Sequence, residues 1–242
     1  METPHPMISN EAQPQMDCAC APLGILTYTK EHARALELDG SGAAVSMLMT
    51  RYAEVVSLSR AAGKSAPVLV SHMPGRAPVS LGPLEDFAAL PLPKGCFNLI
   101  LGRSVLNGSA PGVPDCSSHA RRLQFLIIAR GHLSGGGKLV LGAENLLGRR
   151  HAGRRRGNSK TLWGYRRLLR EAGFSRVSFH LAIPSIENTK STCRLAGPSL
   201  RAYHRIQYPK PAGALLRLSF DVLAGLGISQ YFESAYFIEA YA

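Results

Sequence analysis

The sequence has few cysteines, and their arrangement suits neither a metal site nor a disulfide framework. The five cysteines are odd in number and scattered, and only Cys18 and Cys20 lie close together. The chain contains no C-x-x-C pair and no histidine at ligand spacing from a cysteine. Zinc sites and disulfide-stapled secreted domains need such regular spacing, so we expect free thiols and no bound metal.

Long apolar segments are also absent. No apolar run reaches the roughly 18 to 20 residues that a membrane-spanning helix needs. The first residues, METPHPMISNEAQPQMD, lack the charged-then-apolar order of a secretory signal peptide. We therefore expect no membrane span and a cytoplasmic location. Residues 1–22 show little periodicity and are predicted to form a flexible arm, which leaves residues 23–242 as one domain.

Acidic residues are scarce relative to basic ones. The 242 residues include 16 Asp and Glu but 28 Lys and Arg, and the formal net charge is +12 with neutral histidines. Such a charge favours an acidic partner, for example phosphate, nucleic acid, anionic lipid or an acidic metabolite. Seven basic side chains fall in the run GRRHAGRRRGNSK, at residues 149–160. This run either guides an anionic substrate or forms a solvated loop.

Strand-like and helix-like segments alternate along the chain. The predicted strands lie at residues 35–38, 54–59, 78–82, 97–106, 133–145, 176–183 and 235–242. The predicted helices lie at residues 43–52, 117–132 and 161–174. Residues 60–77 are predicted as a helix and a loop, and residues 184–230 as an insertion before the final strand. The alternation favours a mostly parallel sheet that is covered by helices on both faces.

Four stretches resemble the class I S-adenosylmethionine-dependent methyltransferases. They are ALELDGSGAAVS, LEDFAALPLPKGCFNLILGRSVL, HLSGGGKLVLGAEN and YRRLLREAGFSRV, in the order that the family has them. The match covers roughly residues 30–183 and the final strand. The resemblance implies a Rossmann-like, seven-stranded, mostly parallel α/β sheet with helices on both faces and an antiparallel last strand. It also implies S-adenosylmethionine as the cofactor.

The resemblance assigns the first strand and its loop to the methionine end of the cofactor. In the family this loop faces the cofactor carboxylate with amides at a helix N-terminus, a place held here by Asp39, Gly40, Ser41 and Gly42. Glu37 occupies the place where the family often has an acid ending the first strand. These residues are the predicted cofactor-binding residues of the loop.

Three other segments complete the implied cofactor site. The pair Glu85 and Asp86 matches the acidic motif that lies beside the adenine, and Arg103 follows the fourth strand, near the sulfonium. The second strand normally ends in an acid that holds the ribose, but this chain has Ser57 there. A serine hydroxyl cannot offer the two acceptor oxygens that hold a vicinal diol.

The loop after the first strand also departs from the family. Glycine is expected at positions 39, 41 and 43, whereas this chain has it at positions 40 and 42. Asp39 adds a negative charge near a turn that binds a carboxylate, which should weaken cofactor binding. Three interpretations therefore stay open: an active enzyme, a methyltransferase-like domain that has lost its cofactor, and a simple hairpin turn at Asp-Gly.

Methyl transfer to oxygen or nitrogen needs a group that removes a proton, and Glu144 and His151 are the predicted acid–base residues. Glu144 directly follows the fifth strand of the family, and His151 lies in the basic run. The predicted function is methyl transfer to a small anionic, sugar-like or natural-product metabolite. The alternative is an inactive scaffold or partner subunit of a biosynthetic enzyme, and a protein partner or homodimer is compatible with either.

Nucleic acid is a less favoured partner. Amino-methylating nucleic-acid enzymes of this fold carry Asp/Asn-Pro-Pro-Tyr/Phe after the fourth strand, where this chain has GRSVLNGS. A pyrimidine methyltransferase with a cysteine nucleophile would need a cysteine beside a proline there, and this chain has none. Electrostatic binding of nucleic acid through the basic run stays open as a weaker alternative.

Overall fold

The computed structural model describes most of the predicted domain. The described residues are 32–39, 42–59, 68–83, 87, 91–103, 105–107, 116, 118–147, 159–183, 186, 191–195, 199–200, 218–219, 222–223, 226, 231, 233 and 235–242. The predicted arm at residues 1–22 and most of the predicted insertion at residues 184–230 lie outside these residues.

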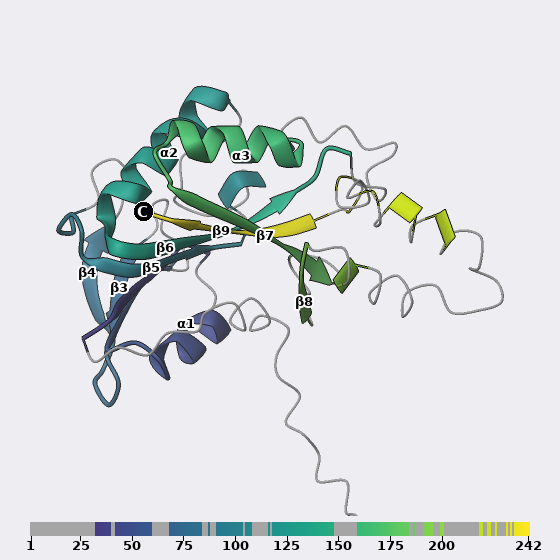
Figure 1. The fold of residues 1–242 in the computed structure, drawn as a ribbon. Helices are drawn as coiled ribbons and strands as arrows, with labels where there is room; N and C mark the ends of the chain where they lie inside the picture. Colours follow the sequence, from purple (N-terminus) through teal and green to yellow (C-terminus); the bar gives the residue numbers. More distant parts are fainter. Residues whose placement is uncertain are drawn as a thin grey trace, which may run out of the picture.

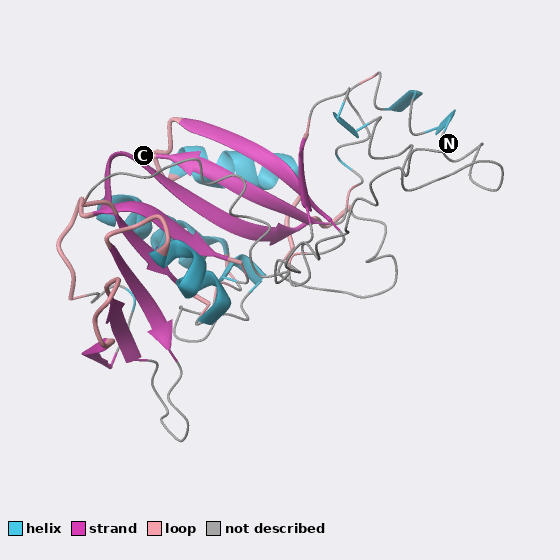
Figure 2. Cartoon of the chain, turned by 90° about the horizontal axis from the view of Figure 1, so that it is seen from below, coloured by secondary structure: helices cyan, strands magenta, loops and turns pink. Residues whose placement is uncertain are grey.

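A single twisted sheet forms the centre of the molecule (Figures 1 and 2). Its strands follow the order β4-β3-β2-β1-β5-β6-β9-β7-β8. The central strands β1 (Arg34–Glu37), β2 (Glu54–Ser59), β5 (Phe97–Gly102) and β6 (Leu133–Glu144) pair in parallel. Their carboxyl ends therefore meet at one edge of the sheet, where ligands bind in open α/β folds.

The last strand of the described chain runs against its neighbours, as predicted. Strand β9 (Ala235–Tyr241) lies between β6 and β7 (Arg176–Ile183) and is antiparallel to both. Six of its seven residues are buried, because it has a strand on each side and is covered on both faces. Strand β8 (Ser191–Arg194) adds an antiparallel edge beside β7.

The prediction of a helix and a loop at residues 60–77 was wrong for the part that the structure describes. Strand β3 (Val68–His72) lies in this segment and pairs antiparallel with both β2 and β4 (Val79–Pro83). Valines at alternate positions fit a pleated surface between two strands, and this packing outweighs a weak helical pattern. The described sheet thus has nine strands instead of the seven predicted, and β3 and β8 account for the difference.

Helices cover both faces of the sheet, as predicted (Figure 1). Helix α1 (Gly42–Met49) packs on one face, and α2 (His119–His132) and α3 (Leu162–Glu171) pack on the other. The Ser118 hydroxyl caps α2 by accepting a hydrogen bond from the backbone of Arg121. Thr161 caps α3 in the same way. Each cap satisfies one of the backbone N–H groups that have no partner within the helix.

Two apolar clusters form the core, one on each face of the sheet. The cluster under α2 and α3 includes Leu36, Leu38, Phe125, Leu168 and Tyr236. The cluster under α1 includes Ala35, Leu48, Val55, Val140 and Phe237. Neighbouring strand residues alternate between the two clusters, as expected for a sheet that is covered on both faces.

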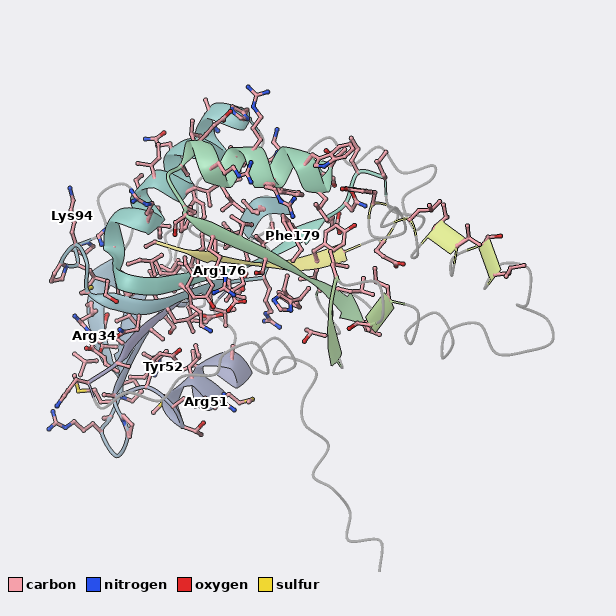
Figure 3. All side chains as sticks on the ribbon, viewed as in Figure 1. Arg34, Arg51, Tyr52, Lys94, Arg176 and Phe179 are labelled. Carbon is pink, nitrogen blue, oxygen red and sulfur yellow. The ribbon has the colours of Figure 1, made fainter. Side chains whose placement is uncertain are left out.

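A buried polar cluster lies on the α1 face, across β6, β9 and β7. Its centre is the Glu239 carboxylate, which is 3.2 Å from Lys138 Nζ and 3.3 Å from His180 Nε2. The Tyr241 hydroxyl donates to Glu239 Oε1 at 2.8 Å. The guanidinium carbon of Arg176, which is labelled in Figure 3, lies 5.4 Å from the centroid of the Tyr241 ring. Burial alone raises the pKa of Glu239, but the hydrogen bonds and the Lys138 charge outweigh it and lower this pKa to about 2.

Candidate functional site

The candidate site lies at the carboxyl ends of β1, β5 and β6. Glu37 ends β1, Asp39 follows it, Arg103 follows β5, and Glu144 ends β6. Each of these apolar strands ends at a polar residue or a turn, and this places the polar side chains at the carboxyl ends of the strands. The predicted site residues that the structure describes therefore converge on one edge, except Ser57, which lies within β2.

Glu37 is completely buried at the end of β1. Its Oε1 accepts a hydrogen bond of 3.1 Å from the backbone N–H of Asp39. The backbone N–H of Leu38 donates instead to the carbonyl of Leu101 on β5, at 2.9 Å. The buried Glu37 carboxylate thus holds the start of the loop against the end of β1 and fixes the direction in which the chain leaves the sheet.

Asp39 and Arg103 join the loops that follow β1 and β5. The backbone N–H of Arg103 donates to Asp39 Oδ2, and Arg103 Nε lies 3.7 Å from the same oxygen. The side chains are only 7% and 15% exposed, respectively. Within the described residues, the buried Nε of Arg103 has no hydrogen-bond partner. The contact offsets the charge of Asp39, which the sequence alone suggested would oppose a cofactor carboxylate.

Two glycines allow the loop after β5 to press against the sheet. A Cβ built on Gly142 of β6 would collide with the carbonyl oxygen of Arg103, and one on Gly102 would lie 2.5 Å from Val105 Cγ2. Val105 belongs to the short 3-10 helix η3 (Val105–Asn107), which follows this loop. The position of the Arg103 backbone therefore depends on the missing side chain at Gly142.

Ser57 does not stand where a ribose-binding acid would end the strand. It is buried, it pairs in register with Glu37, and its hydroxyl lies 2.9 Å from His72 Nε2. Burial lowers the pKa of His72. His72 lies on β3, the strand that was not predicted, so this strand supplies the hydrogen-bond partner of Ser57.

Glu144 and Asn145 lie at the end of β6, and both are buried. The carbonyl of Glu144 accepts a hydrogen bond of 3.1 Å from the Tyr165 hydroxyl. Asn145 Nδ2 lies 2.7 Å from the carbonyl oxygens of both Tyr231 and Glu233. Asn145 also forms an isolated parallel bridge with Lys160, just before α3. The position of Asn145 at the end of a predicted strand was the only sequence signal of this anchoring role.

Five predicted site residues cannot be placed. Gly40, Ser41, Glu85, Asp86 and His151 lie outside the described residues.

Gly42 begins α1, and the space around its Cβ direction is open to 4 Å. The part of the chain that the structure describes contains no cluster of three or more His, Cys, Asp or Glu that could hold a metal ion. It also contains no helix long and apolar enough to cross a membrane.

The charges at this edge suit S-adenosylmethionine. Glu37, Asp39 and Arg103 together carry one net negative charge when all three are ionised, and the cofactor carries one net positive charge. The Arg103 side chain is 15% exposed beside Asp39, and its guanidinium group can pair with an anionic group such as the cofactor carboxylate. The described residues at the ends of β1 and β5 therefore fit the charges of the cofactor.

Solved structures with this arrangement of strands and helices include known methyltransferases. An S-adenosylmethionine-dependent methyltransferase from Archaeoglobus fulgidus aligns with a TM-score of 0.56 and 10% identity, over 93% of this chain and 92% of that chain. Phosphoethanolamine N-methyltransferase 2 from Haemonchus contortus, in complex with S-adenosyl-L-methionine, aligns with a TM-score of 0.51 and 14% identity. That alignment covers 92% of this chain and 51% of the Haemonchus chain.

Sequence comparisons add no closer relative. Neither the protein-family models nor the curated proteins gave a match to this chain. The structural matches are to methyltransferases, the family that the four sequence stretches resemble. The chain has the α/β Rossmann-like fold of the class I S-adenosylmethionine-dependent methyltransferases.

Proposed function

We propose that the protein transfers a methyl group from S-adenosylmethionine to an oxygen or nitrogen of a small anionic, sugar-like or natural-product metabolite. The observation that carries the proposal is the charged arrangement of Glu37, Asp39 and Arg103 at the ends of β1 and β5 of a methyltransferase fold. The net charge of +12 supports an anionic acceptor. The cytoplasmic location stays a prediction.

The cofactor, when bound, supplies an electrophilic methyl group, and the protein supplies charge and orientation. Glu37 and Asp39 favour a cation at the ends of β1 and β5. Arg103 can hold a carboxylate through its half-buried guanidinium. Because Asp39 pairs with Arg103, the negative charge of Asp39 offsets the repulsion between Arg103 and a nearby sulfonium. The site thereby distinguishes a charged cofactor from its neutral demethylated product.

The acid–base roles are proposed for residues at the end of β6. Glu144 can accept the proton that the acceptor hydroxyl or amine loses, since its carboxyl group stands at the same edge as the cofactor residues. His151 is proposed as its partner from its position in the sequence. The loop residues Gly40, Ser41 and Gly42 are proposed to face the methionine carboxylate, Ser57 the ribose, and the pair 85–86 the adenine.

Calorimetric titration with S-adenosylmethionine tests the proposal. We expect saturable binding to the full chain and weaker binding to Glu37→Gln, which removes the buried carboxylate but keeps its shape. Glu171→Gln is the matched control, because that carboxylate lies at the far end of α3 and pairs with Arg167 and His119. Absence of heat at millimolar cofactor would remove the proposal.

A scaffold without catalysis is the second candidate function. It is favoured by the internal partners of the site: Arg103 takes the Asp39 carboxylate, Glu37 takes the Asp39 amide, and Ser57 pairs with His72. A scaffold would copurify from its native cells with another biosynthetic enzyme and would show no cofactor binding. Isolation as a monomer that turns over substrate would exclude it.

A further inference from the structure

Large apolar side chains stand exposed where β6 leads toward α3. Leu146, Leu147 and Trp163 are 55%, 48% and 62% exposed, respectively. We call these three residues the apolar rim. Leu146 is tied to the start of α3 by a hydrogen bond of 3.1 Å from its N–H to the carbonyl of Lys160. Exposed leucine and tryptophan side chains gathered in this way mark an interaction surface.

The apolar rim is held in place by buried polar contacts. The Trp163 ring lies 4.7 Å from the Tyr231 ring, between centroids, and the Tyr231 carbonyl accepts from Asn145. The N–H of Leu147 donates to Asn145 Oδ1 at 3.3 Å. A buried asparagine thus fixes the backbone on both sides of the rim. Binding at the rim therefore does not have to order its backbone, which lowers the cost of docking.

Positive charge follows the apolar rim along α3 toward its C-terminal end, and further positive charge lies on α2. Trp163, Arg167 and Arg170 follow one another at positions i, i+4 and i+7, which places them on one exposed stripe of α3. Arg121 and Arg130 are exposed on α2. We call these four arginines the basic helix face. Figure 3 shows side chains with nitrogen tips projecting from the outer sides of both helices.

Negative charge on these two helices is nearly absent. Glu171 is the only acidic residue of α2 and α3. Its two carboxylate oxygens lie 2.8 Å from Arg167 Nε and 3.1 Å from His119 Nε2. The basic helix face therefore keeps a clear excess of positive charge, which favours an anionic partner.

We propose that the apolar rim and the basic helix face dock the protein on an anionic lipid bilayer. Tryptophan and leucine insert at the boundary between headgroups and acyl chains, while guanidinium groups pair with lipid phosphates. A nucleic acid would satisfy the arginines but would leave Leu146 and Leu147 in water. The rim lies at the carboxyl end of β6, so docking brings the candidate site close to the bilayer. The inference does not depend on methyl transfer.

The single tryptophan of the chain makes the test direct. Trp163 is the only tryptophan among the 242 residues, so its fluorescence reports the apolar rim. The full chain is titrated with phosphatidylcholine vesicles that contain one third phosphatidylglycerol, and with pure phosphatidylcholine vesicles. We expect a blue shift and salt-sensitive binding with the anionic vesicles only.

Variants separate the two parts of the surface. Arg167→Gln with Arg170→Gln should weaken binding to anionic vesicles by roughly 25-fold, from about fivefold for each arginine. Leu146→Ser with Leu147→Ser should weaken binding without changing its salt dependence. Arg76→Gln is the control, because Arg76 lies in the exposed turn between β3 and β4, at the other edge of the sheet.

The outcomes decide between the proposal and its rivals. Circular dichroism first confirms that each variant is folded. No blue shift with anionic vesicles, or equal binding to neutral vesicles, would overturn the proposal. A shift with duplex DNA but none with vesicles would assign the surface to nucleic acid and would also overturn it.

Discussion

The buried polar cluster around Glu239 predicts how stability depends on pH. Replacing Glu239 with glutamine keeps the shape of the side chain but removes the charge that faces Lys138 and His180. The variant should therefore be less stable than the wild type at neutral pH. Glu171→Gln is a matched control, because its exposed carboxylate pairs at the end of α3 and its loss should matter little.

The magnitude follows from the pKa of Glu239. In the folded protein this pKa is about 2, against an ordinary value of 4.5. At 1.36 kcal/mol for each pH unit, the difference corresponds to about 3 kcal/mol of stability. Since the folded pKa is the lower one, the contribution is complete above about pH 4.5. It is lost as the pH falls toward the folded pKa near 2.

Urea denaturation from pH 7 to pH 2.5 measures this effect. We expect the free energy of unfolding of the wild type to exceed that of Glu239→Gln by about 3 kcal/mol at pH 7. Less than half of this gap should remain at pH 3, because glutamine resembles the protonated acid. In thermal unfolding at pH 7, the gap corresponds to a difference in Tm of roughly 6 to 12 °C. A gap that stays constant between pH 6 and pH 3 would refute the reasoning.

Three further predictions concern the candidate site and its supports. Asp39→Asn should weaken S-adenosylmethionine binding roughly tenfold more than S-adenosylhomocysteine binding, because the Arg103 charge then faces the sulfonium; calorimetry giving equal losses would contradict this. Asn145→Ala should lower the free energy of unfolding by about 2 to 3 kcal/mol in urea, because two carbonyls lose their donor. Gly142→Ala should lower it by about 1 to 3 kcal/mol, and an unchanged Tm would argue against the close approach of the Arg103 carbonyl.

Much of the architecture could be predicted from the sequence because apolar runs are bounded by clear turn signals. The strands at residues 54–59 and 176–183 have the predicted bounds. The helix predicted at residues 161–174 is α3, which ends at Glu171, shortly before Gly173 adopts a φ of +88°. Strand β3 was missed because a short valine-rich run forms a strand only where neighbouring strands pair with it. Here those neighbours are β2 and β4.

The candidate site was predictable in position but not in pairing. The family resemblance placed Asp39 and Arg103 in one site, and the structure shows that the loops after β1 and β5 meet at one edge of the sheet. Their direct contact depends on the close packing of Gly142 against the loop, which no local pattern reveals. The pairing of Ser57 with His72 required the additional strand β3. Contacts between segments that are distant in sequence therefore cannot be predicted from local sequence patterns and are seen only in the three-dimensional structure.

The place of β9 has a consequence for how the protein forms during synthesis. In the described sheet, β7 joins the remaining strands only through β9, although β7 precedes it by more than fifty residues. While the ribosome is still adding residues 184–234, β9 has not been made, so no strand connects β7 to β6 by hydrogen bonds. The edge of β6 also stays open during that time, and the sheet is completed only when residues 235–241 have emerged from the ribosome.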